Sequence, residues 1–87
     1  MVIENIHNIK RKNLLVAYRR EYTAMVFIGL HSVPPKSYPF EFSVELTPLG
    51  SSVYRVKMPE SLDLPTIPVM NLLKAKVHEL DRAGNLP

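Results

Sequence analysis

The stretch from Phe40 to Met58, FEFSVELTPLGSSVYRVKM, alternates apolar and polar residues with few interruptions. Alternate side chains of a β-strand point to opposite faces of a sheet, so the stretch predicts two antiparallel strands and a loop. The register that sets Val44 opposite Val56 also sets Glu45 opposite Arg55, which pairs opposite charges. Gly50 lies in the loop and is available for a positive φ. One predicted face is apolar: Phe40, Phe42, Val44, Leu46, Tyr54, Val56 and Met58.

A first hairpin is predicted upstream, within residues 13–31. Residues 13–19 and 22–31 are rich in β-branched and aromatic residues, and the charged Arg19, Arg20 and Glu21 lie between them as a short turn. One long helix is the alternative, but the β-branched content favours strands. Residues 2–9 fit either an extra strand or a short helical turn. The segment VPPKSYP, residues 33–39, is expected to be a connection, because proline cannot donate to a sheet ladder.

The C-terminal part of the chain predicts one helix over residues 66–83, stopped by Gly84. Its expected apolar stripe is Val69, Met70, Leu73, Val77 and Leu80, with Lys74, His78 and Asp81 on the opposite side. The 87 residues are therefore predicted to form a single α+β domain, 1-87. Its antiparallel sheet of about four strands, built from two sequential hairpins, packs against the C-terminal helix in the order β-β-β-β-α.

One helix covers only one face of a sheet, and the first predicted hairpin is apolar on both. In residues 22–30, Ala24, Val26 and Ile28 lie on one face, and Met25 and Phe27 lie on the other. Either the N-terminal segment, with Ile3, Ile6 and Ile9, or a second copy of the chain would cover the spare face. The predicted protein interface consists of Leu15, Ala17, Met25 and Phe27.

The net charge of +3 is unevenly distributed, because six basic residues face two acidic ones up to residue 38. A basic half favours nucleic-acid binding as an alternative function, through Lys10, Arg11, Lys12, Arg19 and Arg20. In the predicted hairpin these form two patches roughly 26 Å apart, well beyond the Debye length of about 8 Å. The simpler interpretation is that they keep a sheet edge solvated.

No group of residues predicts a reaction. The chain has no cysteine, and His7, His31 and His78 lack metal-ligand spacing. Glu41 and Glu45 would stand about 13 Å apart, too far for paired acid–base work. We expect no catalytic residues, metal or cofactor. We also expect no membrane segment and a soluble, cytoplasmic protein. The leading hypothesis is a small non-enzymatic binding or assembly module, which docks a protein partner or forms a homodimer.

Overall fold

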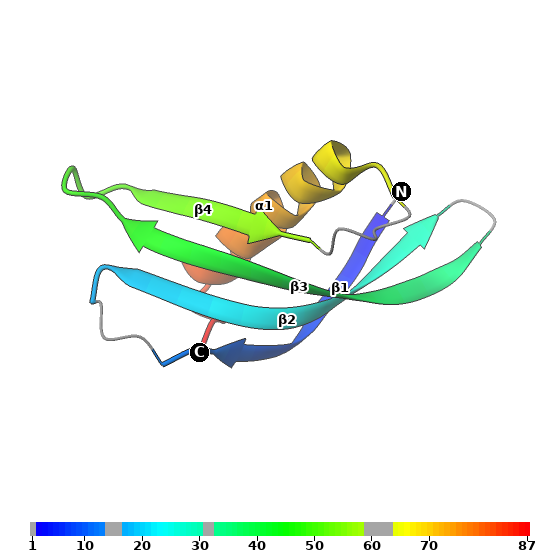
Figure 1. Ribbon diagram of the computed structural model, residues 1–87, viewed down its shortest axis with the longest axis horizontal. Coiled ribbons are helices and arrows are strands. Elements are labelled where there is room, and N and C mark those ends of the chain that lie inside the picture. Colours follow the sequence, from blue (N-terminus) through cyan, green and yellow to red (C-terminus); the bar gives the residue numbers. More distant parts are fainter. Residues whose placement is uncertain (1, 14–16, 31–32, 59–63) are drawn as a thin grey trace.

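The computed structural model describes residues 2–13, 17–30, 33–58 and 64–87. These form one antiparallel sheet in the order β1-β2-β3-β4, followed by one helix, which confirms the predicted α+β class (Figure 1). The elements are β1 (Val2–Arg11), β2 (Arg19–Leu30), β3 (Val33–Leu46), β4 (Ser52–Lys57) and α1 (Thr66–Arg82).

The β3–β4 hairpin has the predicted faces but a different register. Phe42, Val44 and Val56 are buried, and Gly50 has a φ of 86°. The prediction that Val44 faces Val56 is wrong, because Val56 lies opposite Phe42 and Glu45 lies opposite Val53. The loop decides this: Leu46 pairs with Ser52, and the amide of Thr47 donates to the carbonyl of Ser51 at 2.8 Å. Loop closure thus outweighs the one exposed charge pair that the predicted register would form.

The first hairpin lies elsewhere than predicted. Arg19, Arg20 and Glu21 are inside β2 rather than at a turn, and the partner of β2 is β1. Residues 2–9 therefore belong to a strand. Their apolar residues Ile3, Ile6 and Ile9 recur at every third position because the register shifts after Ile3 and again after His7. Each shift adds one residue, so all three isoleucines turn toward the core.

The segment 33–39 belongs to β3 and is not a connection. Pro39 lies opposite Met25 of β2, while β4 pairs with β3 only from Glu41 onward. The amide of Leu46 donates to the carbonyl of Tyr18, so it points toward the β2 side. Backbone direction alternates along the strand, so the nitrogen of Pro39 points away from β2, where no strand needs its missing hydrogen.

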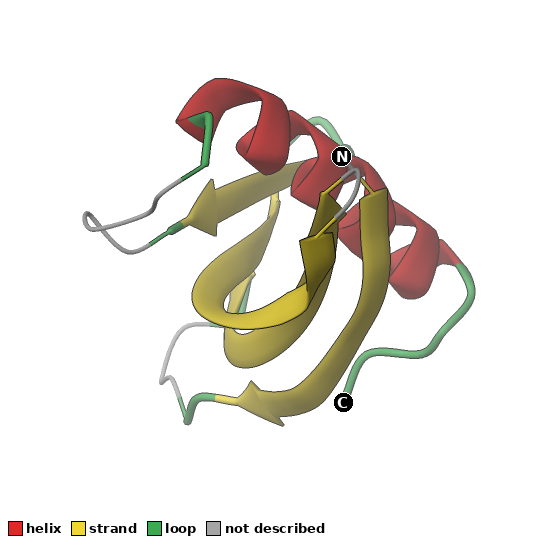
Figure 2. Ribbon diagram, turned by 90° about the vertical axis from the view of Figure 1, so that its right-hand side faces the viewer, coloured by secondary structure: helices red, strands yellow, loops and turns green. Residues whose placement is uncertain are grey.

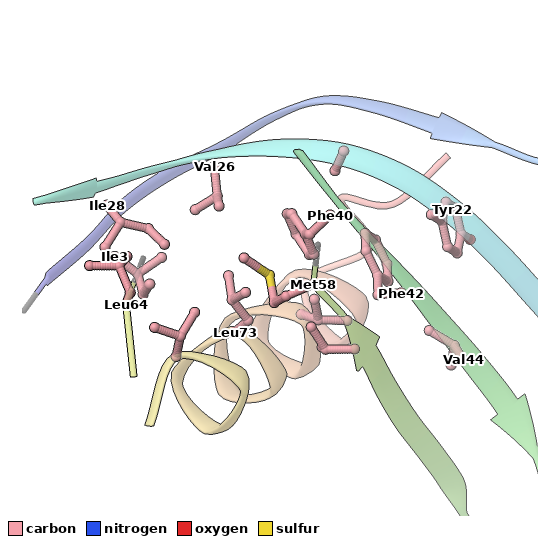
Figure 3. Close-up of a cluster of buried hydrophobic side chains, with 14 residues drawn as sticks. Ile3, Tyr22, Val26, Ile28, Phe40, Phe42, Val44, Met58, Leu64 and Leu73 are labelled. Carbon is pink, nitrogen blue, oxygen red and sulfur yellow. The ribbon is translucent and has the colours of Figure 1, made fainter. Parts of the chain in front are cut away.

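The core lies on one face of the sheet, between the strands and α1 (Figure 2). Val26 of β2, Phe40 of β3 and Leu73 of α1 point toward one another in Figure 3. On α1, Val69, Leu73 and Val77 are fully buried as predicted. The helix ends as predicted at Gly84, which has a φ of 73°. Its amide and that of Asn85 donate to the carbonyls of Asp81 and Leu80, which completes a Schellman motif.

Replacing Leu73 with alanine should lower the free energy of unfolding by about 2–5 kcal/mol, because it opens a cavity beneath the sheet. Leu72 is the matched control, since it is the next residue on the same helix and 40% exposed. Leu72→Ala should cost less than about 1 kcal/mol. Urea denaturation of both variants measures the difference, and equal losses would contradict the buried face assigned to α1.

Candidate functional site

The face of the sheet that points away from α1, the outer face, carries side chains in straight rows across the strands. Strand pairing sets His7, Met25 and Pro39 side by side, and we call these three residues the apolar row. Phe27 lies one step further along β2, 38% exposed, and its ring stacks on that of His7 at 4.8 Å. The Nδ1 atom of His7 is buried and has no hydrogen-bond partner among the described residues, so stacking holds this ring in place.

A charged row adjoins the apolar row. Thr23 pairs with Lys10 of β1 and Glu41 of β3, and Glu41 pairs in turn with Lys57 of β4. The row therefore crosses all four strands and has a lysine at each end. No such alignment is visible in the sequence, because it depends on three registers at once.

A groove of about 530 Å³ lies where the two rows meet. Its outer-face lining comes from both: Lys10, Thr23, Met25, Pro39, Glu41 and Lys57. The groove exists because β4 ends at Lys57 while β3 continues through Pro39, so the fourth strand is missing beside the apolar row. On the β1 side the wall is Asn8, which has a φ of 52° in the second irregularity of that strand.

Ion pairs bind the carboxylates of the outer face. Lys12 Nζ lies 3.0 Å from Glu41, and Arg19 lies 3.2 Å from Glu21 and 3.7 Å from Glu45. The hydrogen bond from Lys12, its charge and the charge of Lys57 lower the pKa of Glu41 below its ordinary value. Around the groove, Lys10, Lys12 and Lys57 thus stand against the one carboxylate of Glu41, which leaves the groove positive.

The structure brings only part of the predicted protein interface together. Met25 and Phe27 lie on the outer face, as predicted. Ala17 is exposed in the turn before β2, roughly 20 Å along the chain from Met25, and Leu15 lies outside the described residues. The isoleucines of β1 pack on the core side, so they leave Phe27 uncovered. Sequence reasoning missed the lysines and Pro39 beside Met25.

The predicted basic residues lie at one end of the sheet, and the expected separation into two distant patches is wrong. Because β1 and β2 are neighbours, the amide of Lys12 donates to the carbonyl of Glu21 at 2.8 Å. Lys12, Arg19 and Arg20 each pair with a carboxylate. Lys10 and Arg11 are exposed, and the ion pairs of the described residues do not include them.

A polar cluster fixes the end of α1 to the sheet, and it corrects the predicted exposure of Asp81. Arg20 donates to one oxygen of Asp81 at 2.9 Å, and the hydroxyl of Tyr54 donates to the other at 2.7 Å. Burial alone would raise the pKa of Asp81. The hydrogen bonds from Tyr54 and Arg20, with the charge of Arg20, outweigh it and lower that pKa. This cluster holds elements together and faces no groove.

Within residues 2–13, 17–30, 33–58 and 64–87, no three or more histidine, aspartate or glutamate side chains gather as a metal site would require. In the same ranges, α1 lacks the length and apolarity needed to cross a bilayer.

The arrangement defines a small α+β protein with one helix-covered sheet face and one open face. The model of one protein family matches residues 1–82, which is most of the chain, so the chain belongs to this family. The family is designated by a locus number, so its name states no activity, ligand or partner. No curated protein and no solved structure matches the chain.

Replacing Asp81 with asparagine should lower the free energy of unfolding by about 1–3 kcal/mol near neutral pH, because the charged hydrogen bond from Arg20 is lost. The pKa of Asp81 is lower in the folded than in the unfolded state. Its stabilisation is therefore complete above the unfolded-state pKa of about 3.9 and is lost as the pH falls through the folded-state pKa.

Urea denaturation of wild-type protein and Asp81→Asn at about pH 7 and about pH 3 tests this, and the two curves should converge at the lower pH. Glu79→Gln removes a 73% exposed carboxylate from the same helix and should change stability by less than about 0.5 kcal/mol. An equal cost of Asp81→Asn at both pH values would contradict the charge-based account.

Proposed function

We propose that this protein is a non-enzymatic docking module, which binds another polypeptide through the outer face of its sheet. The carrying observation is that Met25 and Phe27 lie on this face, where α1 cannot reach, and Phe27 remains 38% exposed. Aromatic and methionine side chains are enriched at protein interfaces. The stacked ring of His7 holds Phe27 in a fixed position, which lowers the entropy cost of docking against it.

The edge of the sheet supports docking on the face rather than by strand addition. An added strand next to β3 would lie beyond the end of β4, opposite Pro39. Proline has no amide hydrogen to donate there, so this open edge is a poor template for pairing. The groove beside Pro39 offers side chains instead.

Phe27→Asp should weaken binding of selected peptides at least about tenfold, because a charge replaces the aromatic anchor. The peptides come from a random display library selected on the immobilised wild-type protein. Leu49→Asp is the control, since Leu49 is 95% exposed in the β3–β4 loop, and it should change affinity less than about twofold. Circular dichroism checks that both variants fold. Failure to select peptides, or equal binding by Phe27→Asp, would contradict the proposal.

Light scattering tests a second copy of the chain as the occupant. A self-associating protein would show a mass near twice 9.9 kDa, and Phe27→Asp would return it to 9.9 kDa. That result would retain the outer face as the interface and identify its partner as the same chain.

Nucleic-acid binding is the second candidate function. It is favoured by one observation: the pairing of β1 with β2 brings Lys10 and Arg11 to the same end of the sheet as Arg19 and Arg20. A labelled single-stranded oligonucleotide of random sequence should then bind at low salt and weaken steeply as salt is added. Lys10→Ala with Arg11→Ala should reduce that binding, whereas Lys74→Ala on α1 should not. No binding at low salt would exclude this candidate.

A further inference from the structure

The groove on the outer face combines two chemistries within one recess. Its ends carry the ammonium groups of Lys10 and Lys57, which belong to β1 and β4 and flank the charged row. Between them, Met25 is half-buried and Pro39 is exposed beside it. A volume of about 530 Å³ is within the range of small-ligand and short-segment sites.

The charge around the groove selects an anionic occupant. Glu41 is already bound by Lys12 at 3.0 Å, so Lys10 and Lys57 are left to meet an incoming carboxylate. A second copy of this chain would bring the same surplus of lysines to the groove, which disfavours it. Nucleic acid is disfavoured as well, since the carboxylates of Glu21 and Glu45 share the outer face and would repel a phosphate backbone.

The apolar part of the groove selects an aliphatic side chain next to that carboxylate. The unbranched side chain of Met25 is flexible and polarizable, and it adapts to irregular apolar groups. Pro39 offers a rigid apolar ring and no backbone donor, so it favours side-chain packing over strand pairing. Both residues adjoin the charged row, so one extended segment can reach the lysines and the apolar row together.

We infer that the groove binds an extended acidic segment of a partner protein, with carboxylates at Lys10 and Lys57 and an aliphatic side chain against Met25 and Pro39. The inference rests on the proposed docking function and names the chemistry of its partner. Successive side chains of an extended segment alternate in direction, so an acidic residue and an aliphatic residue two positions apart point to the same side of the peptide.

Three short labelled peptides test the inference by fluorescence anisotropy on the wild-type protein. One combines Glu and Leu in pairs, so that both occur on each side of an extended chain; the others replace Glu with Lys or Leu with Ser. The Glu–Leu peptide should bind at least about tenfold more tightly than either of the others, since each lacks one of the two chemistries. Equal binding of the three, or none by the Glu–Leu peptide, would overturn the inference.

Charge variants locate the binding. Lys10→Glu with Lys57→Glu should weaken the Glu–Leu peptide at least about tenfold and strengthen the Lys–Leu peptide, because the rim changes sign. Lys74→Glu, an exposed lysine of α1, should leave both affinities within about twofold. If the double variant does not fold, Lys10→Gln with Lys57→Gln replaces it. Unchanged affinity in a folded rim variant would overturn the assignment to this groove.

Two further outcomes separate this inference from the docking function. If display-selected peptides depend on Phe27 but the Glu–Leu peptide does not bind, the outer face docks a partner of other chemistry. If no peptide depends on Phe27, both proposals fail. A single-stranded oligonucleotide that displaces the Glu–Leu peptide and binds more tightly would overturn the inference in favour of nucleic acid.

Discussion

The structure depends on the contact between one side of β2 and the buried stripe of α1. Tyr22, Ala24, Val26 and Ile28 alternate along β2, and all four are buried on the helix side. A strand has only two faces, so this burial forces Met25 and Phe27 to the other side. With one helix in the described part of the chain, nothing there covers that other side. The outer face is thus a direct consequence of how the core is filled.

Alternation in the sequence was sufficient to predict which residues face the core, but not which residues stand opposite one another. The apolar side of residues 40–58 was correct, yet the register was two residues off because an exposed charge pair was weighed above loop closure. The strand β1 escaped recognition because its two register shifts space the isoleucines by three, which resembles a helical pattern. Propensity rules likewise misplaced residues 33–39, since proline is tolerated where a neighbouring strand has ended.

The candidate site was predictable to the same extent. Met25 and Phe27 could be assigned to the spare face from period two alone. The charged row could not, because the alignment of Lys10, Thr23, Glu41 and Lys57 requires the pairing of all four strands. Asp81 shows the same limit on the helix: its sequence position indicates the exposed side, but Arg20 and Tyr54 reach it from the sheet. Contacts between distant elements are set by packing, which a local pattern does not contain.

The difference in length between β3 and β4 connects the architecture to the proposed site. A sheet that stops one strand early leaves an unpaired edge, and such edges promote aggregation by strand pairing. Here Pro39 stands on that edge with its nitrogen directed outward, and it removes a donor that an incoming strand would need. The same residue forms one wall of the groove. An edge closed to backbone pairing but bordered by Met25 and two lysines can still be read by side chains, so the fold permits selective docking without exposing a template for pairing with any strand.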